Sequence, residues 1–253
     1  MKNIQRATAA AMILGVATAC SGGGEATTTV ESTAASTPIT VLAAASTRVL
    51  SEDLTALSKQ ELSFVNAGSS TLVQQLIDGS PGDVLITADK PTMDRAVEAG
   101  VVKEPKVVAT NHIVLVTPKD NPANITGVDD SLRNAQVVAC DSQVPCGRTT
   151  EKFVEKLLPG LEFVSREHSV TDVLGKVTSG EADAGWVYSS DAIAAGDSVK
   201  VFEVPGSEAD PNDYLAAVVT ASQNQSAAQE FVELIDSQEA NTLWTDHGFS
   251  PSQ

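Results

Sequence analysis

The sequence predicts an α/β protein with two lobes. Apolar runs of strand length alternate with segments of helical period along most of the chain, and the connections between them are short. Such alternation is typical of βαβ units, in which parallel strands are covered by helices. The pattern restarts near the middle of the 253 residues, which indicates a second sheet. Apolar residues make up 42% of the chain, enough for a packed core.

The first 19 residues predict a signal peptide. Lys2 and Arg6 precede the apolar stretch 7–19, and small residues lead into Cys20. As a helix this stretch would cover only about 20 Å, less than the roughly 30 Å hydrocarbon core of a membrane. We therefore expect a cleaved leader rather than a permanent span.

Two interpretations of the cleavage site are open. Ala17-Thr18-Ala19 suits an ordinary signal peptidase, which would leave Cys20 as a free N-terminal thiol. The same residues with Cys20 resemble a bacterial lipobox, in which the cysteine is lipidated, although Ala17 stands where Leu is usual. Residues 20–38 are rich in Gly, Ser, Thr and Ala, a composition typical of a flexible tether. Because an anchored protein needs a tether, we favour a lipid anchor at Cys20.

The first βαβ units follow the tether. Residues 39–46 form a continuous apolar run, typical of a strand buried on both faces, and residues 47–57 have helical spacing. Hydroxyl residues at 69–71 cap the next helix, and a proline and a glycine bound the third, residues 91–100. The predicted strands of this half are 39–46, 62–66, 83–87 and 113–117.

The second half repeats the pattern after the polar stretch 119–124, which we interpret as a crossing between lobes. Its predicted strands are 135–140, 162–165, 184–188, 199–204 and 215–220, and its predicted helices are 149–158, 171–179 and 226–246. We expect lobe 1 to comprise residues 39–116 with 215–253, and lobe 2 residues 117–214.

The charge of the chain excludes two classes of partner. Acidic residues outnumber basic ones 33 to 16, which gives a net charge of −17. Loss of residues 1–19 removes Lys2 and Arg6 and no acid, so the mature chain carries 14 − 33 = −19. Nucleic acids and anionic lipid heads both require clustered Lys and Arg, so we expect neither as a partner. Membrane contact is expected only through a lipidated Cys20.

The sequence contains no motif that argues for catalysis. It lacks a G-x-S-x-G elbow, a P-loop and a G-x-G-x-x-G turn, and its three histidines are scattered. Cys140 and Cys146 lie six residues apart and are expected to form a disulfide, the alternative being two unrelated buried thiols. A secreted hydrolase that uses Cys146 or a serine is the enzyme alternative.

Small hydroxyl residues recur where a predicted strand ends and a helix begins, as at Ser46, at Ser69 and at Ser169. The first turn of a helix has free N–H groups and a partial positive charge. Several such termini aimed at one point would bind an anion without Lys or Arg. Each serine taken alone is equally well explained as an ordinary N-cap.

Five sequence blocks resemble, in order and spacing, the periplasmic molybdate-binding proteins of ABC transporters. They are 39–46 (ITVLAAAS), 68–75 (GSSTLVQQ), 82–89 (GDVLITAD), 144–147 (VPCG) and 185–192 (GWVYSSDA). The resemblance covers residues 38–250. It implies a type II periplasmic-binding fold, in which each lobe has a mixed, mostly parallel sheet flanked by helices and the ligand lies in the cleft between lobes.

The resemblance also implies a set of ligand-binding residues. Ser46 and Ser69 would each offer a hydroxyl and a backbone amide, and Tyr188 a phenolic hydroxyl. Cys146, where the family usually has Ala, and Val173 would offer only their backbone amides. The metal would be bound only as the oxyanion, without direct metal ligands and without a cofactor.

A cage of hydrogen-bond donors suits a dianion that carries no proton. A protonated anion such as hydrogen phosphate would find no acceptor there. Sulfate must be excluded by its smaller size, whereas tungstate is expected to bind. The resemblance thus implies an extracytoplasmic monomer that binds molybdate and delivers it to an ABC permease, and not an enzyme. A binding protein for sulfate or phosphate is the alternative.

Overall fold

The computed structural model describes residues 38–252, which belong to one compact unit. The expected signal peptide at 1–19, the anchor Cys20 and the tether up to residue 37 lie outside the described residues. Within residues 38–252, no helix has both the length and the apolar character needed to cross a membrane.

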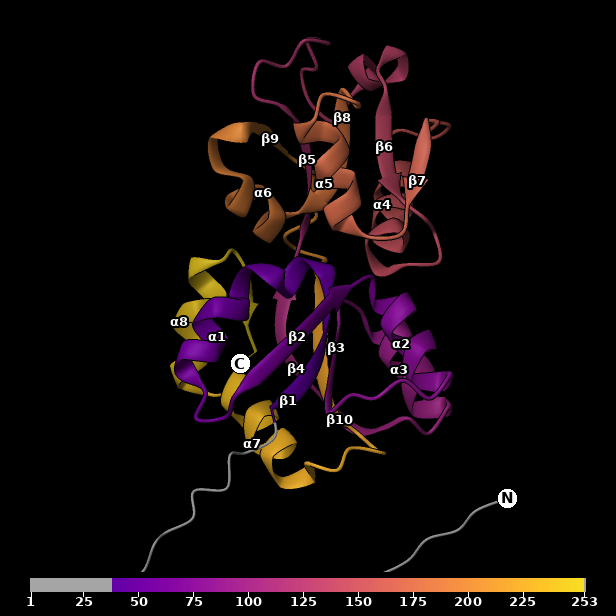
Figure 1. Ribbon diagram of the computed structural model, residues 1–253. Helices are drawn as coiled ribbons and strands as arrows, with labels where there is room; N and C mark the ends of the chain where they lie inside the picture. Colours follow the sequence, from indigo (N-terminus) through magenta and orange to yellow (C-terminus); the bar gives the residue numbers. More distant parts are fainter. Residues whose placement is uncertain (1–37, 253) are drawn as a thin grey trace, which may run out of the picture. The chain divides into compact units, whose positions relative to one another are not determined.

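The first lobe is built on a six-stranded sheet with the order β11-β4-β10-β3-β1-β2. Its strands are β1 (Ile39–Ala44), β2 (Leu62–Ala67), β3 (Val84–Thr87), β4 (Val102–Asn111), β10 (Asn212–Val219) and β11 (Ser250–Pro251). Its helices are the 3₁₀ helix η1 (Ala45–Leu50), α1 (Ser51–Leu57), α2 (Ser69–Ile77), α3 (Lys90–Glu98), α7 (Gln225–Ile235) and α8 (Gln238–Asp246). In Figure 1, α2 and α3 cover one face of this sheet, and α1, α7 and α8 lie on the other.

The second lobe is built on a five-stranded sheet with the order β7-β6-β8-β5-β9. Its strands are β5 (Ile113–Pro118), β6 (Val137–Cys140), β7 (Ser165–Glu167), β8 (Ala184–Tyr188) and β9 (Val199–Glu203). Its helices are α4 (Pro145–Leu157), α5 (Val170–Thr178) and α6 (Ser189–Ala195), with short 3₁₀ helices η2 (Asp130–Asn134) and η3 (Gly196–Ser198).

Strand β1 shows why the first sheet is covered on both faces. Val41 and Ala43 pack into the cluster that contains α1, α7 and α8, whereas Leu42, between them, packs with α2 and α3. Successive side chains of a strand point to opposite faces, so a strand buried on both faces must be apolar throughout. The continuous apolar run in the sequence has this cause.

Both sheets are mixed, as expected. In each sheet two pairings are parallel and the others are antiparallel, so the parallel share is smaller than expected. Strand β4 accounts for part of this difference, because it was not predicted and pairs antiparallel with β10 and β11. Four consecutive residues, 103–106, are polar or proline, and Glu104 has a positive φ of 49°, so the sequence pattern of this strand is weak.

The expected lobe boundaries need two corrections. Residues 113–116 were expected in lobe 1, but strand β5 pairs with β8 and β9 in the second sheet. Residues 212–214 were expected in lobe 2, but they already belong to β10 of the first sheet. The chain therefore passes between the sheets at His112 and again within residues 204–211, and not at the polar stretch 119–124. The polar composition of residues 119–124 indicates an exposed turn, and exposure alone does not show that the chain passes between the lobes there.

The parallel strands position the site. In the first lobe β1 leads into η1 and β2 into α2, and in the second lobe β6 leads into α4 and β7 into α5. Carboxyl ends of parallel strands lie at one edge of a sheet, so the helix starts of each lobe are gathered at one edge.

Candidate functional site

A small cavity, with about 10 Å³ of space open to a water-sized molecule, lies where these helix starts meet. It is lined from the first lobe by Ala44, Ala45, Ser46, Gly68, Ser69 and Ala88, and from the second by Val144, Pro145, Cys146, His168, Ser169, Val170 and Tyr188. Four of the five residues predicted to bind the ligand, namely Ser46, Ser69, Cys146 and Tyr188, are among them. The lining contains no Lys, Arg, Asp or Glu.

The two first-lobe serines are buried and each contacts a second polar group. Ser46 lies in η1, and its hydroxyl is 2.6 Å from the hydroxyl of Tyr214. Ser69 begins α2, and its hydroxyl accepts the Ala88 N–H at 3.1 Å. A serine oxygen that accepts a bond from the protein keeps its own proton for a ligand. Ser69 is thereby set up as a donor toward the cavity.

Cys146 contributes from the start of α4. Its sulfur forms the expected disulfide with Cys140, with Cα atoms 5.7 Å apart. Pro145, at the first position of the helix, has no N–H, so the amide of Cys146 is the first of α4 and has no acceptor within the helix. This amide is available to an anion, while the thiol is consumed in the disulfide.

Val173 is not among the residues that line the cavity, and its role in binding the ligand stays a prediction. Its N–H donates to the carbonyl of Ser169 at 3.3 Å, as an interior helical amide does. Helix α5 begins at Val170, one residue earlier than expected, and Ser169 and Val170 line the cavity in its place. The sequence carried the signal: Ser169 accepts the Asp172 N–H, the arrangement of a capping box, which fixes the helix start.

Tyr188 ends β8, and its ring is almost fully buried. Burial raises the pKa of Tyr188 well above its usual value, and the neighbouring Tyr214 adds to this effect. Its hydroxyl accepts the side-chain N–H of Asn212 at 2.9 Å. The phenol therefore stays protonated, and its own O–H is free to donate into the cavity.

Arg148, two residues after Cys146 on α4, is already neutralised. Arg148, on α4, donates from Nε and Nη2 to one carboxylate oxygen of Asp89 at 2.8 and 2.6 Å. It also donates to the hydroxyl of Thr92 and to the carbonyl of Gln143. Every nitrogen of the guanidinium is thus engaged, so the cavity offers neutral donors and not a cationic clamp.

Hydrogen bonds hold the two lobes together around the cavity. Arg148 of the second lobe reaches Asp89 of the first, and the Ser70 hydroxyl donates to the carbonyl of Gln143 at 2.8 Å. Asn212 of β10 accepts from Thr149 in the second lobe. The structure therefore shows the lobes closed on the cavity.

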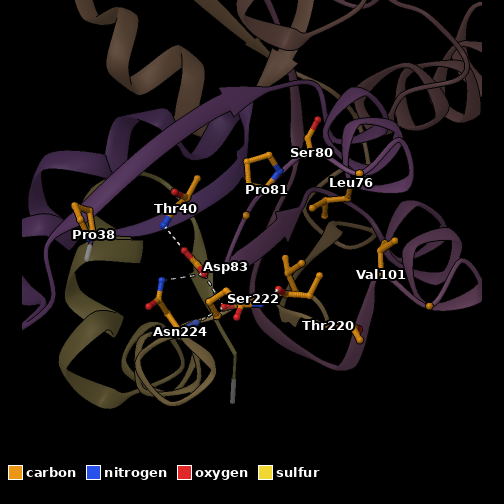
Figure 2. Close-up of a pocket in the computed structure, with 16 residues that line it drawn as sticks. Pro38, Thr40, Leu76, Ser80, Pro81, Asp83, Val101, Thr220, Ser222 and Asn224 are labelled. Atoms are coloured by element: carbon orange, nitrogen blue, oxygen red, sulfur yellow. Dashed lines mark hydrogen bonds between the residues drawn. The ribbon is translucent and has the colours of Figure 1, made fainter. Parts of the chain in front are cut away.

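A larger hollow, with about 620 Å³ of space open to a water-sized molecule, lies elsewhere, at the opposite ends of β1 and β3. Figure 2 shows Asp83 at its centre, where the carboxylate accepts from the Thr40 N–H, the Ser222 hydroxyl and the Asn224 side chain. A carboxylate repels anions, and this one already has its donors from the protein. The large hollow is therefore not suited to an anion, and size alone does not identify the site.

One group of side chains of metal-ligand type lies outside the cavity. Ligand atoms of His112, Glu203 and Glu208 come within 4.8 Å of one another, and both glutamates are exposed. The group lies where the chain crosses between the sheets and lines no part of the cavity. It gives no support for a resident metal cofactor at the site.

The residues that line this cavity do not support the alternative of a hydrolase. Cys146 is in a disulfide and has no thiolate to offer. His168 lines the cavity, yet the hydrogen bonds of Ser46 and Ser69 run to Tyr214 and Ala88 and not to an imidazole. The site has the donors of a binding site and no nucleophile activated by a base.

Comparison with known proteins agrees with this geometry. Residues 33–250 match the family model of the bacterial extracellular solute-binding proteins. The chain is 34% identical over 250 residues to the molybdate-binding protein ModA of Mycobacterium tuberculosis, covering 95% of each chain. It is 28% identical over 195 residues to YvgL of Bacillus subtilis, a candidate ABC transporter substrate-binding lipoprotein, covering 73% of this chain and 74% of that protein.

A solved structure shares the fold. The periplasmic molybdate-binding protein of Azotobacter vinelandii superposes with a TM-score of 0.74 at 18% identity, covering 85% of this chain and all of that one. At this identity the likeness concerns the fold alone, and it confirms the predicted two-lobed α/β architecture.

Proposed function

Because this chain belongs to the family of bacterial extracellular solute-binding proteins, we propose that it binds molybdate between its two lobes and delivers it to an ABC permease. Proteins of this family bind solutes outside the cytoplasm and are not enzymes. The proposal includes tungstate as a second ligand, a monomeric state and a lipid anchor at Cys20. The similarity to the molybdate-binding protein ModA of Mycobacterium tuberculosis and the chemistry of the cavity support molybdate as the ligand.

The observation that carries the proposal is the donor character of the cavity. Hydroxyls of Ser69 and Tyr188 each accept a hydrogen bond from the protein and keep a proton for the ligand. The amide of Cys146 adds a donor from a helix start. Since the lining has no carboxylate, a fully deprotonated oxyanion finds only favourable partners there.

The bulk charge of the chain does not oppose this proposal. The net charge of −17 repels an approaching dianion, but exposed charges are screened beyond about 8–10 Å at physiological salt. Donors inside the cavity are in direct contact with the ligand and escape this screening. The affinity therefore depends on the cavity, and the net charge affects chiefly the rate of association.

Thermal unfolding with a panel of oxyanions tests the ligand. A ligand present at about 100 times its dissociation constant adds about 2.7 kcal/mol to the free energy of unfolding. Molybdate and tungstate should raise the melting temperature, and sulfate and phosphate should not. A melting temperature that molybdate leaves unchanged and sulfate or phosphate raises would identify the alternative oxyanion-binding function.

A single variant tests whether the ligand lies in this cavity. Tyr188→Phe removes one donor to a charged ligand, a bond that contributes about 1.5–3 kcal/mol, so the molybdate affinity should fall about 10- to 150-fold. Calorimetric titration measures this change. An unchanged dissociation constant would remove Tyr188 from the binding site.

The anchor is tested by cell fractionation. Cys20 follows a basic and apolar leader and precedes a tether-like stretch. Cys20→Ala should release the chain from the membrane fraction into the soluble one. Retention of the variant on membranes would contradict lipidation at this residue.

A further inference from the structure

We propose that Asn212 and Tyr214, on strand β10, are positioning residues that direct the hydroxyls of Tyr188 and Ser46 toward the bound anion. This inference rests on the proposed function. Neither residue lines the cavity, and both are buried, with exposed fractions of 8% and 0%. They lie two residues apart on one strand, so their side chains project to the same side of the sheet.

The hydrogen bonds of Asn212 fix the orientation of its side-chain amide. Its Oδ1 accepts the Thr149 hydroxyl at 2.5 Å, so its NH₂ must face the other way. The two N–H groups donate to the Ala88 carbonyl at 3.0 Å and to the Tyr188 hydroxyl at 2.9 Å. A side-chain amide has two donors, and both are thus used. Because the Tyr188 oxygen accepts from Asn212, its own proton is directed elsewhere, and the cavity lies in reach.

Tyr214 stands in the same relation to Ser46. Their hydroxyl oxygens are 2.6 Å apart, and geometry alone permits either to donate. In the proposed arrangement Tyr214 donates to Ser46, which leaves the Ser46 proton for the anion.

The rings are held so that these directions persist. Tyr214 packs edge-on against Tyr188, with ring centroids 5.9 Å apart, and against Phe249 at 5.1 Å. Burial also raises the pKa of Tyr214 well above its usual value, so its proton is retained. Each of these two cavity hydroxyls thereby has one acceptor lone pair occupied by the protein, which disfavours a ligand that carries a proton.

Two double-mutant cycles test this role by calorimetric titration with sodium molybdate. Asn212→Leu and Tyr214→Phe should each weaken binding about 3- to 10-fold, the range for one neutral hydrogen bond. In a Tyr188→Phe background Asn212→Leu should have little further effect, and in a Ser46→Ala background the same holds for Tyr214→Phe. Purely structural residues would instead give losses that multiply.

The preference for molybdate over phosphate is a second measurement, and a loss of stability alone would not change it. In Tyr214→Phe the Ser46 hydroxyl can turn and accept, so the preference for molybdate over inorganic phosphate, which keeps a proton at neutral pH, should narrow. Ser222→Ala is the matched control, because it removes a buried hydroxyl from the distant Asp83 cluster and should alter neither affinity nor selectivity.

The outcomes separate this inference from the proposed function. If the wild type binds molybdate and Tyr214→Phe has the same affinity and selectivity as wild type, the positioning role is overturned and the proposed function stays intact. Multiplying losses in both cycles would overturn it as well. A wild-type chain that binds no oxyanion would overturn the function, and this inference with it. If Asn212→Leu does not fold, the Tyr214→Phe and Ser46→Ala cycle decides alone.

Discussion

Gly68 in the first lobe and the carbonyl oxygen of His168 in the second leave no space between them for a side chain. A Cβ placed on Gly68 would lie 2.3 Å from that oxygen, a distance that real Cβ atoms essentially never show. The backbone of Gly68, with φ −57° and ψ 133°, is one that any residue can adopt. The glycine is therefore required by the contact between closed lobes and not by local backbone conformation.

Gly68→Ala should separate folding from closure. The open chain should be as stable as the wild type or slightly more so, because alanine restricts the unfolded chain at a compatible backbone conformation. Closure should be impeded, so the molybdate affinity should fall by at least about tenfold, or 1.4 kcal/mol. Gly175→Ala is the matched control, since its added Cβ meets nothing within 4 Å. Wild-type affinity in calorimetric titration of Gly68→Ala would contradict this account of closure.

The ion pair between Arg148 and Asp89 should favour the closed state. Both groups are partly exposed, with 33% and 10% of their side chains accessible, so we expect about 1 kcal/mol. Arg148→Gln should therefore weaken molybdate binding about fivefold, mainly through faster dissociation. Stopped-flow measurement of the dissociation rate checks this. Lys90→Gln, which breaks the exposed pair with Asp94 within α3, should leave the rate unaltered, and equal effects of both variants would refute the role of Arg148 in closure.

The disulfide between Cys140 and Cys146 should serve stability more than binding. A loop this short is expected to contribute about 2 kcal/mol through the entropy of the unfolded chain. The double substitution of both cysteines by alanine should lower the melting temperature, yet keep the dissociation constant within about threefold of wild type, since only the amide of residue 146 faces the ligand. Complete loss of molybdate binding in a variant that still folds would show that more than this amide is needed.

Asp191 should make stability depend on pH. Burial raises its pKa from 3.8 to about 7, and the charge of Arg48 offsets this only in part. Between these values the folded chain holds a proton that the unfolded chain has released, so wild-type stability falls as the pH rises toward about 7 and then levels off. Asp191→Asn removes this dependence. The melting temperature of the variant minus that of wild type should increase by at least about 3 °C from pH 5 to pH 8. For a chain of this size each kcal/mol of stability corresponds to about 2–4 °C. A constant difference across this range would contradict the assignment.

Much of the fold could be predicted because its central strands are buried on both faces. The apolar runs of β1 and β3 are direct consequences of that burial. Strand β4 escaped prediction because residues 103–106 are solvent-facing and interrupt the pattern. The crossing between lobes at His112 was also missed, since a one-residue connection between two strands leaves no mark in composition.

The cavity was predictable only where a residue type repeats at a helix start. Ser46, Ser69 and Ser169 carry that signal, and the predicted start of α5 differs from the observed one by a single residue. Asn212 and Tyr214 could not be found in this way. Their partners lie 24 to 168 residues away in sequence, and periodicity contains no information on such contacts.

The central claim is that neutral donors alone hold the anion, and a crystal structure of the molybdate complex with anomalous scattering from molybdenum tests it most directly. The account predicts one molybdenum peak in the cavity, with oxygens bonded to the hydroxyls of Ser46, Ser69 and Tyr188 and to the amide of Cys146, and with Arg148 still paired to Asp89. A cavity without a molybdenum peak, or an ion clamped by Arg148 or any lysine, would contradict it.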